Sequence, residues 1–167
     1  IRVEPVSDRA TLKEFIHLPW KLYHSDPYWI PPLLVERLHT FSPKNPYFQH
    51  ARWQCWIAYR GQEPVGRISA QIDDLHLSRY KDQTGFFGLL EAEDDAGVFH
   101  TLFQTAEEWL QAQGMTNVRG PFNLSINQEC GLLVDGFDSP PMIMMGHARP
   151  YYSEWVERNA YKKAQDL

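Results

Sequence analysis

The middle of this chain carries the pattern that most restricts its fold, because it predicts a strand, a long helix and a second strand in succession. Thr84–Glu91 is largely apolar, as a buried strand is, and its glycines permit a bulge or a close backbone approach. Asp94 or Asp95 is suited to cap the helix, Gly114 to end it, and Asn117–Arg119 to begin the next strand. Strands joined in this way run parallel, which indicates an α/β fold. The apolar face of the helix comprises Val98, Phe99, Leu102, Phe103, Ala106, Trp109 and Leu110.

The first half of the chain predicts antiparallel strands. Ile1–Val6 alternates apolar and polar residues, as a half-buried strand does. Trp53–Arg60 and Val65–Asp73 flank the turn Gly61–Pro64, which is typical of a β-hairpin. The expected sheet is therefore mixed, with an antiparallel N-terminal part and a parallel pair at its end.

Several shorter elements are expected around this sheet. Asp8 is suited to cap a helix that Pro19 interrupts, and Pro32 to open a second short helix. Tyr151–Asn159 has the length of a late helix. Met142–Met145 is apolar and is interpreted as an interior strand whose methionines fill the core.

Composition limits the classes of function. With 167 residues, 43% hydrophobic and 22% charged, the chain is a folded protein of one-domain size. Its net charge of -5 argues against a nucleic-acid-binding surface. Cys55 and Cys130 make no disulfide framework, and no apolar run reaches the roughly 20 residues of a membrane span. We therefore expect a cytoplasmic protein without membrane or nucleic-acid partners. Because the chain begins at Ile1 rather than methionine, we expect residues 1–167 to be a single domain of a longer protein with room for a second one.

The stretch Arg119–Pro141 combines turn residues with polar groups placed among apolar ones. One interpretation is structural: asparagines close turns by hydrogen bonds between side chain and backbone. The other is a ligand site, with Glu129 as base or amine anchor and Asn123 and Asn127 as orienting groups. A polar group buried without a partner costs about 1–3 kcal/mol, so either partner must exist. Arg119 is a further candidate for contacts with phosphate or carboxylate groups.

Three weaker candidates lie elsewhere. Asp73, Asp74 and His76 are spaced as metal ligands can be, but a solvated strand end explains them without a second ligand cluster. His147 is near the end of the polar stretch and is open to a catalytic role. Arg67 is a second basic residue suited to contact an anionic group.

Two segments resemble the GNAT superfamily of N-acetyltransferases. "GLLEAEDDAGVFHTLFQTAEEWLQAQGMTNVRG" is similar to the superfamily's strand, pyrophosphate loop, long helix and next strand, and "PYYSEWVERNAYKKAQDL" to its late helix. More narrowly, "LPWKLYHSDPYWIPPL", "GRISAQID" and "GPFNLSINQECGLLVDGFDSPP" resemble a bacterial branch of acetyltransferase-like proteins of uncertain function. The resemblance covers nearly the whole chain.

This resemblance implies a GNAT-like fold, flanked by helices, in which acetyl-CoA or another acyl-CoA is the co-substrate and no metal is needed. The acyl-CoA lies where two parallel strands splay apart, with its pyrophosphate on the N–H groups of a helix N-terminus. The implied reaction is transfer of an acyl group to a small-molecule amine, with an acid and a base. The implied residues are Leu89, Leu90 and Glu91 at the thioester, Ala96, Gly97 and Val98 at the pyrophosphate, Glu129 as base, Tyr152 as acid, and Asn123, Asn127 and Arg119 at the acceptor.

The sequence also departs from the pattern of the superfamily. The expected phosphate loop contains Glu91, Glu93, Asp94 and Asp95, and carboxylates repel a pyrophosphate. The usual acid tyrosine is replaced by Val156, with Tyr152 one turn earlier. Two hypotheses follow: an acyl-CoA-dependent N-acyltransferase, or a catalytically silent domain of the same fold that binds a small ligand or supports a partner domain.

Overall fold

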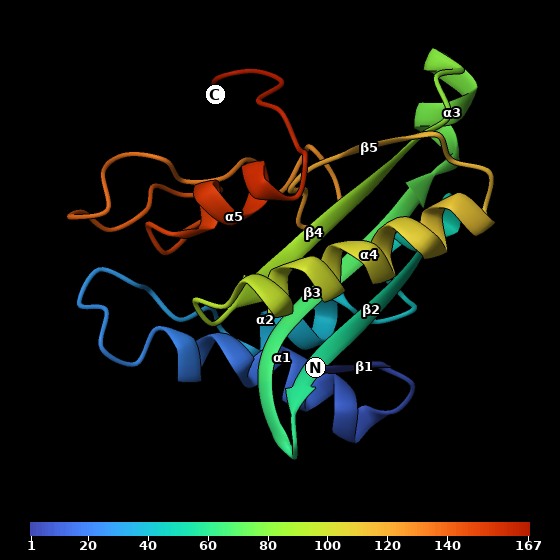
Figure 1. The fold of residues 1–167 in the computed structure, drawn as a ribbon. Helices are drawn as coiled ribbons and strands as arrows, with labels where there is room; N and C mark the ends of the chain where they lie inside the picture. Colours follow the sequence, from blue (N-terminus) through green and yellow to red (C-terminus); the bar gives the residue numbers. More distant parts are fainter.

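The computed structural model describes residues 1–167 and contains one five-stranded sheet in the order β1-β2-β3-β4-β5 (Figure 1). The first four strands pair antiparallel, and β5 pairs parallel to β4 at the edge. This arrangement confirms the mixed α/β sheet expected from the sequence. The strands are β1 (Arg2–Pro5), β2 (Ala51–Arg60), β3 (Glu63–Asp73), β4 (Thr84–Ala92) and β5 (Asn117–Arg119).

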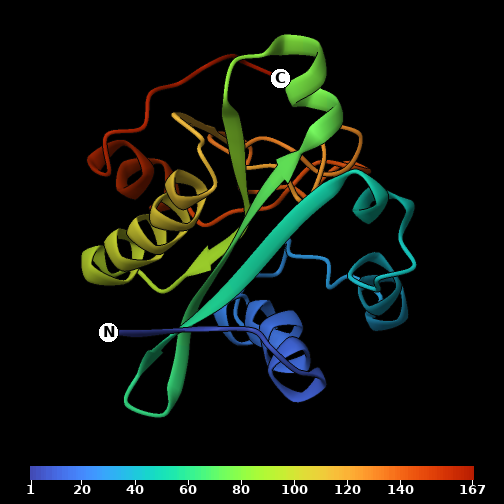
Figure 2. The ribbon, with the colours of Figure 1, turned by 90° about the vertical axis from the view of Figure 1, so that its right-hand side faces the viewer.

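Helices cover both faces of the sheet, so that α1 and α4 lie on opposite sides of it (Figure 2). The buried side chains form one cluster under α4 and a second one under α1. None of the helices combines the length and apolar character that crossing a bilayer requires. The helices are α1 (Arg9–Leu22), α2 (Leu34–Thr40), the 3-10 helix η1 (Pro46–Gln49), α3 (Asp74–Tyr80), α4 (Ala96–Ala112) and α5 (Tyr152–Arg158).

Local signals placed most elements correctly. Asp8 caps α1 in a capping box with Thr11, and Asp95 caps α4 by accepting hydrogen bonds from the first amides of the helix. The hairpin β2–β3 and the unit β4–α4–β5 lie where the sequence predicts them. Asp73 caps α3, a helix that the sequence did not indicate, and therefore does not lie at a solvated strand end.

Two predictions about proline and methionine were wrong. Pro19 does not interrupt α1 but lies buried inside it, and α2 begins at Leu34, two residues beyond Pro32. Met142–Met145 form no strand and no part of the core: the segment runs over the surface in a turn, with Ile143 93% and Met142 78% exposed. Prolines precede this segment and no sheet edge lies beside it, so its apolar side chains have nothing to pack against.

A bulge in β4 decides which way the end of the strand faces. Ser69 pairs with Gly88 and Arg67 with Glu91, so two residues of β4 lie opposite one residue of β3. Before the bulge, Phe87 packs against α4; after it, Leu90 packs in the α4 cluster and Leu89 in the α1 cluster. Side chains alternate along a strand, so the extra residue turns Glu91 away from α4 and toward α1.

Candidate functional site

A pocket of about 380 Å³ lies on the α1 side of the sheet, where β4 and the loop after β5 meet α1 and α2. Its charged lining includes Arg67 and Glu91 from adjacent strands, Arg37 from α2, and Glu129 from the loop. A second hollow of about 410 Å³, lined by Phe41 and Trp53 among others, has Arg52 as its one charged side chain. The first pocket is therefore the candidate site, because it alone of the two brings acids and bases together.

Glu91 is the carboxylate at the centre of this pocket. Its side chain is 14% exposed, and its Oε2 accepts hydrogen bonds of 2.7 Å from the hydroxyl groups of both Tyr23 and Tyr152. The Arg67 guanidinium lies 3.9 Å from its other oxygen. Burial raises the pKa of Glu91 above its ordinary value, against the opposing effects of Arg67 and the two tyrosines. Burial and the charge of Glu91 raise the pKa of both tyrosines well above the ordinary value, so both act as neutral donors.

Arg67 is held in place by the proline inside α1. Pro19 has no N–H group, so the carbonyl of Phe15, four residues earlier, is left without its helical partner. The Arg67 Nη1 donates to this carbonyl at 2.7 Å, and the guanidinium lies over the Phe15 ring at 4.8 Å. The buried arginine is thus fixed by backbone, ring and carboxylate together.

The loop after β5 brings a second carboxylate to the pocket. Glu129 accepts from the Nη2 of Arg37 at 2.7 Å and from the Nδ2 of Asn123 at 3.0 Å. The Oδ1 of Asn123 accepts from the backbone amide of Leu89 at 2.8 Å, which ties the loop to the bulge. The buried Gln71 also ties the loop, donating to the carbonyl of Phe122 at 2.6 Å. Polar groups of this loop therefore both hold it in place and line the pocket.

Asp26 and His147 form a further pair in the pocket wall. The Nε2 of His147 lies 2.9 Å from Asp26 Oδ2, and the Nη1 of Arg149 lies 3.3 Å from the same oxygen. The His147 side chain is 4% exposed, and its Nδ1 is buried without a partner in the protein. The pair is separated by 121 residues in sequence, and no local pattern around Asp26 or Tyr23 indicates a role in the site.

Comparisons with known proteins were made for the whole chain, and no family model matches it. The chain superposes on the crystal structure of an aminoglycoside acetyltransferase from an uncultured soil metagenomic sample, in complex with sisomicin. The TM-score is 0.59 at 13% sequence identity, over 99% of this chain and 91% of the other. The chain has the GNAT acetyltransferase fold. The resemblance seen in the sequence is confirmed at the level of the fold.

Two curated relatives are much more similar in sequence. Protein YghO of Escherichia coli K12 is 51% identical over 160 residues, which cover 96% of this chain and 41% of the relative. A protein of Caulobacter vibrioides named bacterial ceramide synthase is 53% identical over 169 residues, which cover 100% of this chain and 44% of the relative. The chain thus spans less than half the length of the curated relatives it matches.

The cleft that holds acyl-CoA in the GNAT fold is occupied here by side chains of the protein itself. At the start of α4, the amides of Gly97 and Val98 donate to the carboxylate of Asp95 at 2.7 and 3.3 Å. These are two of the donors expected to hold the pyrophosphate. Where β4 and β5 diverge, the amide of Ala92 donates to the Tyr152 hydroxyl and its carbonyl accepts from Tyr151. The residues present therefore do not fit a CoA pyrophosphate at this place.

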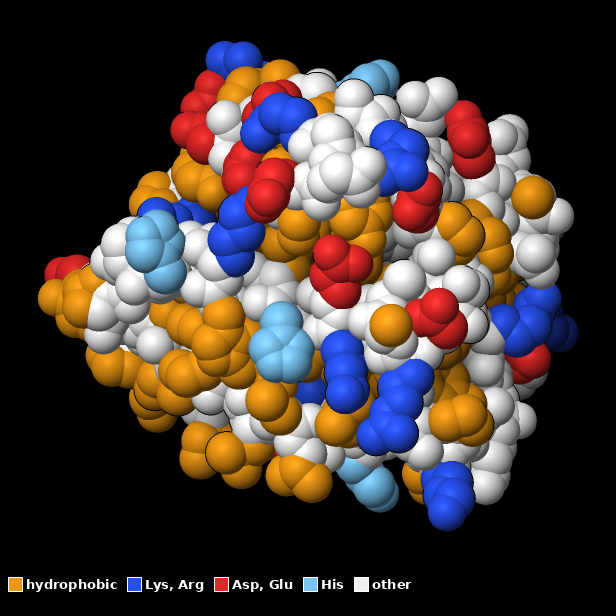
Figure 3. All heavy atoms as spheres, turned by 90° about the horizontal axis from the view of Figure 1, so that it is seen from below, with side chains coloured by type: hydrophobic (Ala, Val, Ile, Leu, Met, Phe, Trp, Pro, Cys, Tyr) orange, Lys and Arg blue, Asp and Glu red, His pale blue; other side chains and the backbone are white.

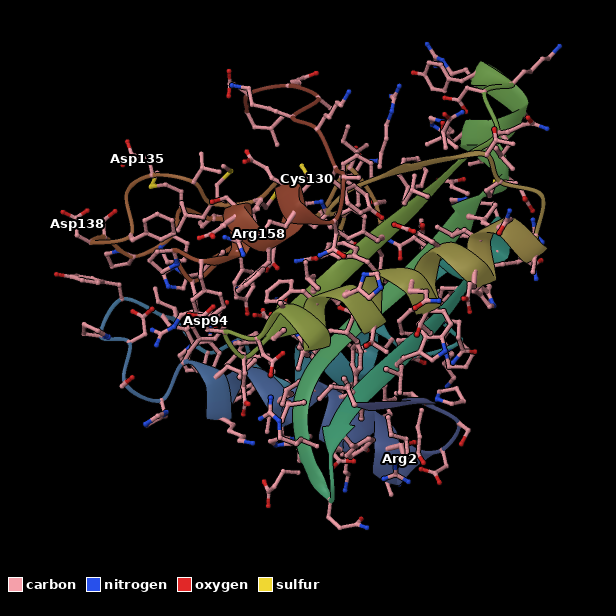
Figure 4. The ribbon with its side chains drawn as sticks, in the orientation of Figure 1. Arg2, Asp94, Cys130, Asp135, Asp138 and Arg158 are labelled. Atoms are coloured by element: carbon pink, nitrogen blue, oxygen red, sulfur yellow. The ribbon has the colours of Figure 1, made fainter.

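The acidic loop before α4 is paired internally as well. Arg60 bonds both Glu93 and Asp95, at 2.7 and 2.8 Å. Asp94 lies in the turn between β4 and α4, close to α5 (Figure 4), and accepts from the indole of Trp155 at 2.7 Å. These contacts satisfy the carboxylates within the protein and leave them no need of a ligand.

The structure brings some of the predicted site residues together and separates others. Asn123, Glu129, Leu89 and Glu91 line the pocket, and Tyr152 contacts Glu91 from behind. Asn127 and Arg119 are exposed and lie outside its lining. Ala96, Gly97 and Val98 form the first turn of α4. The structure contains no group of three or more His, Cys, Asp and Glu side chains arranged to hold a metal ion.

Acetyl-CoA and free CoA, titrated into the chain by calorimetry, are expected to give no saturable heat up to about 1 mM, because the donors of the cleft are engaged. The matched variant is Gly97→Asp, which adds a further carboxylate where the pyrophosphate would lie. Saturable binding by the unmodified chain that this substitution abolishes would contradict the interpretation of the cleft.

Proposed function

We propose that this chain supplies the amine-binding site of an N-acyltransferase whose acceptor carries a long apolar chain. The observation that carries the proposal is the buried carboxylate of Glu91 in a pocket with exposed apolar rims. The acyl donor expected from the fold is an acyl-CoA, which we place outside the cleft of this chain because the residues there do not fit it. The role of this chain is therefore recognition of the acceptor.

The rims of the pocket are two uncharged segments. Residues 28–35, "YWIPPLLV", connect α1 to α2, and residues 140–146, "PPMIMMG", precede α5. Both contribute to the lining, and Leu33 and Val35 are 67% and 74% exposed. Figure 3 shows hydrophobic side chains gathered at the left edge of its view, the side on which Figure 1 draws both connections. Exposed apolar surface of this kind marks a binding site for an apolar partner.

The chemistry of the pocket suits an ammonium group next to an apolar chain. Glu91 attracts an ammonium, and a carboxyl group whose pKa is raised can take a proton from it near neutral pH. Tyr23 and Tyr152 hold the carboxylate in place, which makes Tyr152 a positioning residue in this proposal. Glu129, held by Arg37, offers a second negative group to the amine.

The names of the relatives agree with this proposal. A ceramide is the amide of a long-chain amine, and the Caulobacter vibrioides relative is named for its synthesis. The superposed acetyltransferase is named for aminoglycosides, which are also amines. An acceptor with an amine and a long hydrocarbon chain accounts for the carboxylates and for the apolar rims together.

Binding of decylamine to the chain, measured by calorimetry below its micellar concentration, tests this proposal. We expect saturable binding that Glu91→Gln weakens at least about tenfold, since the amide no longer offers a full charge to the ammonium. Glu63→Gln is the matched control, because Glu63 is a surface carboxylate outside the pocket. Butylamine should bind far more weakly, as each buried methylene contributes about 0.8 kcal/mol. The proposal fails if decylamine does not bind or if both substitutions have equal effects.

A further inference from the structure

Three buried side-chain atoms have no hydrogen-bond partner in the protein, and two of them belong to the candidate pocket. They are the Nε of Arg67 and the Nδ1 of His147; the third is the Oε1 of Gln128, whose residue is not part of the lining. A buried polar atom without a partner costs about 1–3 kcal/mol, and such atoms are rare in folded proteins. Two of them in one pocket indicate a polar ligand group that both can reach.

The two atoms are chemically complementary. Arg67 Nε carries a hydrogen and can only donate. A carboxylate can only accept, so the hydrogen bond of His147 to Asp26 places the proton of the neutral ring on Nε2. The Nδ1 of His147 is then an acceptor. A hydroxyl group can satisfy both atoms, because its oxygen accepts from Arg67 and its hydrogen donates to His147.

Neither side chain is free to turn toward a partner in the protein. Arg67 is fixed by the Phe15 carbonyl and by Glu91. His147 is fixed by Asp26, and the ring of Tyr23 lies edge-on to it, with the ring centres 5.4 Å apart. Tyr23 also bonds Glu91 through its hydroxyl group, so one residue connects the two unpartnered atoms to the carboxylate.

We propose that Arg67 and His147 form a subsite for a hydroxyl group adjacent to the amine, so that the acceptor is a long-chain amino alcohol. This inference rests on the proposed function, in which Glu91 receives the amine. Asp26 is the positioning residue of the subsite, because its carboxylate decides which nitrogen of His147 accepts. The hydroxyl group is recognised separately from the amine, and the two contributions can be measured apart.

The experiment compares two ligands that differ only in this hydroxyl group, 2-aminodecan-1-ol and decan-2-amine, by calorimetry on the same chain. The unmodified chain is expected to bind the amino alcohol about tenfold more tightly, as two added hydrogen bonds predict. His147→Phe should remove this preference and leave the affinity for decan-2-amine unchanged. His24→Phe is the control, since His24 is exposed and outside the pocket.

Asp26→Asn tests the subsite with the imidazole retained, and serves where His147→Phe lowers the yield of folded protein. The neutral amide no longer confines the ring proton to Nε2, so the preference for the amino alcohol should fall while the plain amine binds as before. Equal affinities of the two ligands for the unmodified chain would overturn the inference, as would a preference that survives both substitutions or an equal weakening of both ligands. If neither ligand binds, the proposed function fails, and the subsite fails with it.

Discussion

Gly88→Ala is expected to lower the free energy of unfolding by about 3 kcal/mol or more, the upper range for overpacking a well-packed site. A Cβ atom at Gly88 would lie 1.7 Å from the carbonyl oxygen of Phe122. That oxygen belongs to backbone and cannot rotate away, because it accepts from the buried Gln71 and the Phe122 amide donates to Phe87. The loop after β5 must therefore leave β4. Urea denaturation of both proteins measures the difference.

Gly97→Ala is the matched control for this substitution. A Cβ atom at Gly97 would have as its nearest neighbour an Asp95 oxygen at 3.2 Å, at the far end of a side chain. Gly97 is in the first turn of α4, where alanine suits a helix better than glycine. Stability close to that of the unmodified chain is expected. A Gly88→Ala protein as stable as this control would show that the loop does not lie against β4 as described.

Glu91→Leu is expected to cost about 3–5 kcal/mol, the range for removing one partner of a buried ion pair. The substitution leaves the Arg67 guanidinium buried without a counter-charge and the hydroxyl groups of Tyr23 and Tyr152 without their acceptor. Glu91→Gln should cost less, since its amide oxygen still accepts from a tyrosine. Chemical denaturation of the three proteins gives the comparison.

The double variant Glu91→Leu with Arg67→Leu separates charge from packing. Replacing both members of a buried pair by apolar residues is often close to neutral, so the double variant should recover much of the loss. It will not recover all of it, because the Phe15 carbonyl freed by Pro19 also loses its donor. A double variant less stable than Glu91→Leu would mean that the charge of Glu91 contributes little to the stability of the fold.

The parts of this fold that sequence predicts are those that depend on neighbours in the chain. Caps such as Asp8 and Asp95 need only the next few residues, and the strands β2, β3 and β4 follow from short apolar runs and turn signals. Met142–Met145 was assigned wrongly because an apolar run has the same appearance whether it fills a core or borders a pocket.

The candidate site was predictable in part, for the same reason. Asn123 and Glu129 are six residues apart, and the concentration of polar groups around them pointed to the pocket they line. Tyr23, Asp26 and His147 come together only through the tertiary fold, across separations such as the 121 residues between Asp26 and His147. No periodicity or spacing records such contacts. The resemblance placed Glu91 at the cofactor, whereas its side chain belongs to the pocket on the other face.

The extra residue in β4 has a consequence for finding this site in other sequences. An alignment that treats the strand as unbroken keeps one side-chain phase from Thr84 to Ala92, and so assigns Glu91 to the same face as Phe87, within the α4 core. The carboxylate then matches a column of apolar residues and looks like an isolated misfit. Allowing a one-residue gap opposite Ile68 restores the correspondence, and the acid then aligns with positions that face a pocket.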